Sequence, residues 1–317
     1  MKVVVIGGTG HIGTFLVPRL VNAGHEVIVG SRGKREPYLP NRAWTEIEHI
    51  EIDRTAEDDA GTFGSRIAVL DADAVIDLIC FTPESAQQLV DALRPGETLL
   101  LHCGTMWVHG ARGDTREARG AVTEDEPRQP FGDYGIKKAA IERLLLDATE
   151  RGDARAVVLH PGHLVGPGWN PVNPAGHFNL DVFRKIARGE TLVLPNEGEE
   201  TVHHVHADDV AQAFELALTR STKAVGESFH VVSPAPMSLR EYAEAMYAHF
   251  NQRPRLEFLP WDEWRHTASE EEAAATWDHI AHSPNGSIAK ARKRLGYAPR
   301  YSSLDAVIES ISDRIND

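Results

Sequence analysis

Apolar and polar positions in the first 160 residues alternate between two spacings. Six short runs are apolar at most positions, as strands buried on both faces of a sheet are. Three stretches between them repeat apolar residues at helical spacing. The expected strands are 2–6, 26–29, 48–52, 74–79, 98–102 and 155–160, and the expected helices are 11–23, 83–93 and 135–150. This alternation predicts an α/β fold, a doubly wound parallel sheet with helices on both faces.

The pattern changes after Pro161. Residues 161–200 are rich in Pro, Gly, Asn and His, and they contain one expected helix at 179–188. Further strands are expected at 202–206 and 228–232, and further helices at 208–219, 238–250, 286–295 and 304–315. No long linker or internal repeat separates the halves. We therefore expect a smaller C-terminal lobe that is interleaved with the sheet.

Composition and charge narrow the class of protein. The chain has 317 residues and a net charge of −14, which argues against nucleic-acid or anionic-membrane partners. No apolar run reaches the roughly 20 residues of a membrane-spanning helix. Cys80 and Cys103 are the only cysteines, so the chain has neither a disulfide framework nor a zinc pattern. We expect a reduced, cytoplasmic protein.

A glycine-rich segment joins the first strand to the first helix. Gly7, Gly10 and Gly13 allow a tight turn, a close approach of the backbone to a pyrophosphate, and close packing of helix on strand. The segment predicts a Rossmann dinucleotide-binding domain at 1–165 and a substrate-binding lobe at 166–317, of which about 202–232 returns to the sheet. The loop residues expected to bind the cofactor are Gly7, Thr9, Gly10, His11, Ile12 and Gly13.

The spacing Gly-x-x-Gly-x-x-Gly directly after the first strand resembles the extended short-chain dehydrogenase/reductase superfamily, in its NAD(P)-dependent epimerase/dehydratase branch. Three later segments are similar to the motifs of that branch. They are the His-Pro to Gly-Pro-Gly run at 160–168, the Asp-Asp motif at 206–210, and the Leu-Gly-Tyr-x-Pro sequence at 295–299. The resemblance thus spans nearly the whole chain.

The end of the second strand bears on the choice of nucleotide. An NAD site usually has an acid there, which holds the ribose 2′-hydroxyl. Here Ser31 and Arg32 stand at the end of the strand, with Lys34 and Arg35 close behind. A guanidinium can grip a 2′-phosphate, so NADP is slightly favoured over NAD. Asp53 ends the third strand, where the resemblance implies an acid near the adenine.

Tyr134 and Lys138 are four residues apart on an expected helix, so both can face one cleft. A tyrosine has an ordinary pKa of about 10, and a nearby ammonium together with a nicotinamide ring would favour its phenolate. This pairing predicts a proton-transferring Tyr134, and Lys138 could also hold the nicotinamide ribose. The resemblance places Thr105 at the catalytic hydroxyl position. Its role would be to bind the substrate oxygen and orient Tyr134.

Other candidates surround these residues. Cys80, His160 and His163 are expected beside the cofactor, with His160 standing where the resemblance implies arginine. The stretch 200–206 lacks the arginine with which nucleotide-sugar members clamp their substrate. The expected substrate lining is instead neutral, aromatic and rich in histidine: Phe81, Trp107, His109, Trp169, Asn170, His177 and His204, with Cys80 and His163 close by. His203, His204 and His206 make a poor zinc site, and no metal is expected.

Three functions remain open on the sequence. The first is an epimerase or dehydratase that moves a hydride transiently at a hydroxyl-bearing carbon of a sugar-like or other small polar substrate. The second is an NADPH-dependent carbonyl reductase or dehydrogenase. The third is a non-enzymatic member that senses nucleotides or associates with RNA, and the intact Thr105, Tyr134 and Lys138 argue against it. By family analogy the chain could form a homodimer.

Overall fold

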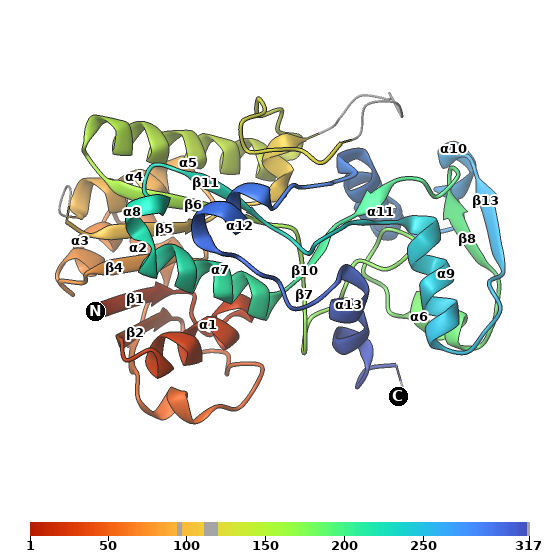
Figure 1. Cartoon of the computed structure of the whole chain (residues 1–317), viewed down its shortest axis with the longest axis horizontal. Coiled ribbons are helices and arrows are strands. Elements are labelled where there is room, and N and C mark those ends of the chain that lie inside the picture. The colour runs from red at the N-terminus through yellow and green to blue at the C-terminus, as the bar shows by residue number, and fades with distance from the viewer. Residues whose placement is uncertain (94–96, 111–119, 316–317) are drawn as a thin grey trace.

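Seven parallel strands form the central sheet of the computed structural model, which describes residues 1–93, 97–110 and 120–315 (Figure 1). The order of strands is β11–β6–β5–β4–β1–β2–β3, so the chain reverses its direction of progress between β1 and β4. Open sheets of this kind bind ligands beyond the carboxyl ends of the strands at such a switch point. The strands are β1 (Lys2–Ile6), β2 (Glu26–Ser31), β3 (Glu48–Glu51), β4 (Ala74–Asp77), β5 (Leu99–Cys103), β6 (Arg155–Pro161) and β11 (Ser228–Val231).

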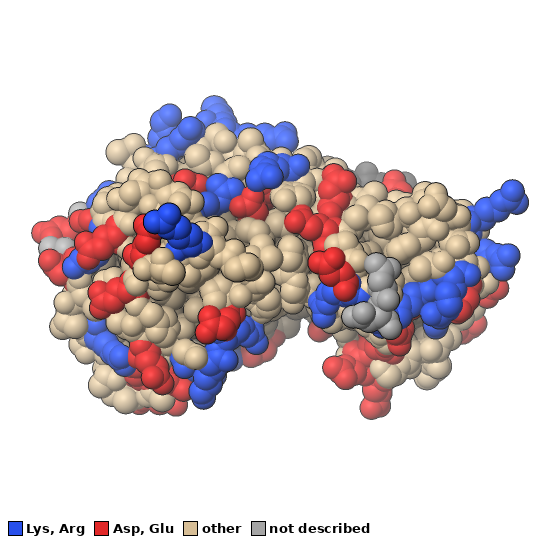
Figure 2. Space-filling model, turned by 90° about the horizontal axis from the view of Figure 1, so that it is seen from below, with Lys and Arg blue, Asp and Glu red and all other residues tan. Residues whose placement is uncertain are grey.

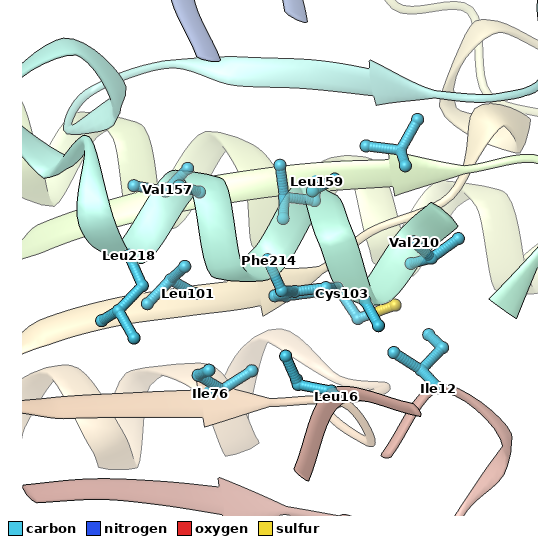
Figure 3. Close-up of a cluster of buried hydrophobic side chains, with 14 of the residues drawn as sticks. Ile12, Leu16, Ile76, Leu101, Cys103, Val157, Leu159, Val210, Phe214 and Leu218 are labelled. Atoms are coloured by element: carbon cyan, nitrogen blue, oxygen red, sulfur yellow. The ribbon is translucent and has the colours of Figure 1, made fainter. Parts of the chain in front are cut away.

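Helices cover both faces of this sheet because its strands are apolar on both faces. Successive side chains of a strand point to opposite sides, so Val3 and Val5 join one apolar cluster and Val4 and Ile6 another. The first cluster packs under α1 (His11–Asn22), α7 (Ala207–Thr219) and α12 (Ala289–Leu295), and Figure 3 shows Phe214 and Leu218 of α7 close to Leu101 of the sheet. The second packs against α3 (Phe63–Ala68), α4 (Pro83–Ala92) and α5 (Gly132–Arg151). The predicted doubly wound fold is confirmed.

The smaller lobe has an apolar cluster of its own. Phe183, Tyr242, Tyr247 and Trp264 are its large buried side chains. Its helices are α6 (Asp181–Ala187), α9 (Leu239–His249), α10 (Trp261–Trp264), α11 (Glu270–His282) and α13 (Ser303–Ile311), and its strand pairs are β7 (His163–Val165) with β10 (His204–His206), β8 (Leu192–Pro195) with β13 (Leu256–Leu259), and β9 (Thr201–Val202) with β12 (Met237–Ser238).

The structure differs from the sequence prediction in several short elements. The strand expected at 202–206 is divided into β9 and β10 at His203, whose ring bonds the carbonyl of Ser233 at 2.9 Å. Strands β8 and β13 were not predicted, because each has four residues and its partner lies about sixty residues away. The α-helices that were not predicted are α2 (Arg54–Asp59), α3, α8 (Ser221–Ala224), α10 and α11.

The two parts of the molecule are interleaved. Strand β11 lies beside β6 at the edge of the main sheet, and α7 packs on α1 (Figure 1). We propose on this basis the division into a first domain at 1–165 and a lobe at 166–317 whose middle portion returns to the sheet. Acidic and basic side chains are interspersed on the face shown in Figure 2, which is hollowed between the larger and smaller parts. Within the described ranges, no helix is both long and apolar enough to cross a membrane.

Candidate active site

The glycine-rich loop lies at the carboxyl end of β1, where close contacts explain its composition. Gly7 has a φ of +81°, and a Cβ there would lie 2.7 Å from Ile79. Gly13 faces inward instead, since a Cβ would lie 2.0 Å from the carbonyl oxygen of Gly8. Gly7 and Gly10 therefore border the ligand space, whereas Gly13 serves the packing of α1 on the loop.

A cavity of about 540 Å³ opens beside this loop toward β2 and β3. Ser31, Arg32 and Asp53, which are predicted to bind the cofactor, line it, and Asp53 also caps α2 by accepting from the backbone of Ala56. The buried Arg54 was missed by the sequence analysis and also lines this cavity. The predicted residues in this cavity are Gly7, Thr9, Gly10, Ser31, Arg32, Asp53 and Phe81.

A second cavity of about 570 Å³ adjoins the first, and the two share Gly7, Gly10, Arg35, Ile79 and Phe81. It extends from the loop, past the end of β5 and the start of α5, to α11 of the smaller lobe. The predicted residues brought together here are Gly7, Gly10, His11, Ile12, Phe81, Thr105, Trp107, Tyr134, Lys138, His163 and Trp169.

The three predicted catalytic residues meet in this second cavity. Tyr134 and Lys138 lie one turn apart on α5, and the Tyr134 side chain is 41% exposed. The Lys138 ammonium is buried and donates to the backbone carbonyls of Cys80 at 2.7 Å and Cys103 at 2.6 Å. Thr105 follows β5, and its hydroxyl oxygen accepts the backbone N–H of Trp107 at 3.3 Å.

The Tyr134 phenol differs electrostatically from what the sequence predicted. Although part of the residue is exposed, loss of water around the phenol raises its pKa above the ordinary value, and so does the neighbouring Cys103. A hydrogen bond with the Thr105 side chain acts in the opposite direction but does not outweigh burial. Burial also lowers the pKa of Lys138, whose ammonium faces carbonyls rather than the phenol. The protein alone therefore keeps Tyr134 protonated near neutral pH.

Several predicted residues lie outside both cavities, because their side chains bond to the protein interior. His109 bonds the ring of His230 at 2.8 Å, and His204 bonds the carbonyl of Val172 at 3.0 Å. His177 is buried against Asn173. The remaining predicted residues that do not line either cavity are Gly13, Cys80, His160 and Asn170.

His160 requires a specific correction. It was expected beside the cofactor, but its side chain is fully buried and bonds Glu142 and the backbone of Thr105. Cys80 is buried as well, and its carbonyl rather than its thiol meets Lys138. The sequence identified the right strand ends but not which way the side chains there would point.

Aromatic and histidine side chains form the far wall of the second cavity. The ring of Trp107 lies edge-on to that of Tyr134, with 5.8 Å between ring centroids, and it stacks on the ring of His282, with 4.2 Å between centroids. His279 meets His163 edge-on at 4.9 Å, and burial holds the pKa of His279 at about 4. These histidines are therefore uncharged at neutral pH, and the wall is polarisable but not cationic.

Helix α11 supplies three lining residues that the sequence analysis missed, namely Ala275, Asp278 and His279. A usable signal was present, since Ser269 and Glu272 form a capping box at the start of this helix. Two further missed residues, Val172 and Phe178, come from the irregular stretch before α6, where no periodicity marks an inward-facing position.

One cluster among the described residues has the spacing of a metal site. Single ligand atoms of Asp77, Cys80 and His102 lie within 4.8 Å of one another. Asp77, however, is already paired with the guanidinium of Arg54 at 2.6 Å, and burial raises the pKa of Cys80 to about 12. A protonated thiol beside a fixed cation is a poor ligand set, so absence of a metal stays our prediction.

The buried histidines make stability depend on acid pH. Burial lowers their folded-state pKa below the 6.5 of an unfolded chain, so the unfolded chain binds more protons as pH falls. The free energy of unfolding should therefore decrease from about pH 6.5 downward, by ~1.4 kcal/mol per pH unit for each histidine involved. The values are about 3 for His11 and His204 and about 4 for His203, His206 and His279.

Urea unfolding between pH 7 and pH 5 measures this slope. His204→Asn should make the slope shallower, because about one proton fewer is taken up on unfolding. Tyr242→Phe is the matched control, because it removes another hydrogen bond to Val172 without removing a group that titrates in this range. An equal slope in the wild type and His204→Asn would contradict the assignment.

Comparison with known proteins places this geometry in a family. Residues 3–231 match the model of the NAD dependent epimerase/dehydratase family. A 2′-dehydrokanamycin reductase from Streptomyces kanamyceticus is 28% identical over 249 residues, which cover 78% of this chain and 66% of that protein. A low-salt glycan biosynthesis protein from Haloferax volcanii is 24% identical over 335 residues, covering 100% of this chain and 99% of that protein.

The fold is also similar to a solved UDP-glucose 4-epimerase from Thermotoga maritima, with a TM-score of 0.70 and 18% identity over 98% of each chain. The resemblance predicted from the motifs is confirmed, as is the class of enzyme. The chain belongs to the NAD dependent epimerase/dehydratase family and is an NAD(P)-dependent oxidoreductase of the extended short-chain type.

Proposed function

We propose that this enzyme acts as an epimerase or dehydratase on a sugar-like or other small polar substrate, through transient oxidation of a hydroxyl-bearing carbon. The observation that carries the proposal is the meeting of Thr105, Tyr134 and Lys138 in the cavity beyond the glycine-rich loop. A substrate hydroxyl in this cavity could lose its proton from oxygen to Tyr134, while the carbon that bears it would lose its hydride to a nicotinamide held beside the loop.

The residues around the loop fit a nicotinamide dinucleotide, which supplies the hydride acceptor and donor. Helix α1 begins after Gly10 with no side-chain cap and no acid in its first turn. Its free N–H groups and the positive end of its dipole suit a pyrophosphate. Gly7 lines the space beside this helix end, and a Cβ there would clash with Ile79, so the turn that brings the backbone to a ligand depends on glycine.

Three side chains have different roles in the proposed proton transfer. Tyr134 exchanges a proton with the substrate oxygen, and Thr105 hydrogen-bonds that oxygen and the phenol. Lys138 fixes the ends of two strands through their carbonyls, so the cavity keeps its shape around the reacting carbon. The uncharged histidine and tryptophan side chains of the far wall suit an apolar or uncharged part of a substrate, and Asp278 adds one acidic group there.

A carbonyl reductase that uses NADPH is the second candidate, and two observations favour it. The phenol of Tyr134 is protonated in the protein alone, which is the form that donates to a carbonyl during reduction. Among the described residues that line the second cavity, the one arginine is Arg35, at the end shared with the nucleotide side. The relative named a 2′-dehydrokanamycin reductase is in keeping with this alternative.

For the nucleotide we propose NADP or NAD, with NADP slightly favoured. Arg32, Lys34 and Arg35 all line the cavity beside β2 and β3, and Ser31 ends the strand where an acid would favour NAD. A cytoplasmic location, the absence of nucleic-acid partners and a homodimer by analogy stay predictions.

Release of the bound nucleotide separates the two candidate reactions. We expect freshly purified protein, once denatured, to yield about one NAD or NADP per chain by chromatography with mass detection, because an epimerase or dehydratase regenerates its cofactor in place. Empty protein that takes up NADPH in a titration would instead support the reductase.

Tyr134→Phe should lower kcat by about 10²-fold or more, because it removes the proton carrier and little else. The reference activity is that of the wild type on any compound it turns over from a panel of carbonyl compounds and nucleotide sugars. The Kd for the nucleotide should change by less than about twofold, since the phenyl ring remains. Retained turnover would remove Tyr134 from proton transfer.

Arg32→Ala should weaken NADPH by about 10- to 100-fold while NADH changes little, because a charge-assisted contact to the 2′-phosphate contributes roughly 1.5–3 kcal/mol. Fluorescence titration of both nucleotides measures the two values. Arg42→Ala is the matched control, since its exposed side chain carries the same charge outside both cavities. Equal losses for the two nucleotides would exclude the contact.

A further inference from the structure

A third polar residue continues the catalytic face of α5. Tyr134, Lys138 and Glu142 are spaced at four residues, so all three lie along one side of the helix. The Glu142 side chain is almost fully buried, and Arg128 holds both of its oxygens at 2.6 and 2.8 Å. Burial opposes its ionisation, but the neighbouring His160 and the hydrogen bonds lower its pKa well below the ordinary value.

His160 connects this carboxylate to the catalytic strand. Its Nε2 lies 3.0 Å from Glu142, and its Nδ1 lies 3.1 Å from the backbone nitrogen of Thr105. A backbone N–H can only donate, so Nδ1 is the acceptor and Nε2–H donates to the carboxylate. Both ring nitrogens are thereby used, and the tautomer follows from the partners.

The packing around Gly104 shows how closely the ring approaches the turn after β5. A Cβ at Gly104 would lie 2.3 Å from Nδ1 of His160. The next residue, Thr105, is then held twice: its N–H by His160 and its hydroxyl oxygen by the N–H of Trp107. The Thr105 side chain also hydrogen-bonds the phenol of Tyr134, so these two backbone contacts hold a hydroxyl that lies beside Tyr134.

We infer that Arg128, Glu142 and His160 form a positioning relay that sets the backbone, and hence the hydroxyl direction, of Thr105. The inference rests on the proposed function, in which Thr105 binds the substrate oxygen. None of the three relay side chains lines either cavity, so they act through Thr105 and not by touching substrate. A displacement of about 1 Å at a reacting group can slow a reaction ~10²-fold, so loss of the relay should lower kcat measurably.

Two amide substitutions separate the bonds of His160. The short side chain in H160N carries its oxygen near the position of Nδ1 and can still accept from Thr105. The longer one in H160Q carries its amide near Nε2 and can still reach Glu142. We expect kcat to fall about 10- to 100-fold in H160Q and less than about threefold in H160N, with the NADPH Kd unchanged in both.

The ranking of the two variants is the readout that a purely structural role would not produce. Equal losses of kcat, a larger loss in H160N, or no loss in either would overturn the inference. Thermal unfolding of each variant is recorded alongside, so that a drop in kcat is not confused with partial unfolding.

Two further variants keep the test decisive. T105V reports on the proposed function: an inactive T105V with a fully active H160Q refutes the relay alone, whereas an active T105V refutes the role of Thr105 and the relay with it. If neither His160 variant folds, R128K acts at the half-buried outer end of the relay. It should lower kcat without weakening NADPH, and an unchanged kcat would overturn the inference.

Discussion

The buried ammonium of Lys138 is the contact on which the architecture of the site depends. It joins α5 to the segment after β4 and to the end of β5, through the carbonyls of Cys80 and Cys103. An isolated charge in the interior is strongly unfavourable, so this lysine holds its place only because two carbonyl dipoles replace its water. Helix α5 therefore has one allowed position along the sheet, and Tyr134 is carried with it to the cavity.

Other charged groups beneath the site are likewise paired with a partner inside the protein. Arg54 is bonded to Asp77 under the nucleotide side, and Arg128 to Glu142 under the catalytic side. Each pair brings a charge into the interior with its counter-ion, which a charge alone could not tolerate. Burial lowers the pKa of the neighbouring His102 and His230, which therefore add no charge to this part of the interior at neutral pH.

The sequence predicted the fold well wherever periodicity and turn chemistry coincide. The strand run at β1, the glycine turn after it and the start of α1 all indicate the same arrangement. It predicted less in the smaller lobe, because the four-residue strands β8 and β13 are too short to show a clear period and pair with each other across about sixty residues. Helix α11 was missed although Ser269 and Glu272 mark its first turn, since acids and tryptophans obscure its apolar face.

Site residues were predicted well where nearby sequence determines their position, and poorly where a distant residue determines the direction of the side chain. Tyr134 and Lys138 follow from their helical spacing together with their place on the helix after the fifth strand, and both line the cavity. His160 and His204 lie on predicted strands. A strand pattern indicates which face of the sheet a side chain is on, but not which group it bonds there. Their partners, Glu142 and the carbonyl of Val172, lie 18 and 32 residues away and carry no mark of the contact.

The acceptors that hold Lys138 are main-chain atoms, and this has an evolutionary consequence. A carbonyl is present whatever residue stands at positions 80 and 103, so either cysteine can be replaced without loss of a hydrogen bond. Substitutions there need no compensating change elsewhere, while the lysine itself has no equivalent. Among related sequences such a contact would show one constant position and no covarying partner, and coevolution methods would not detect it.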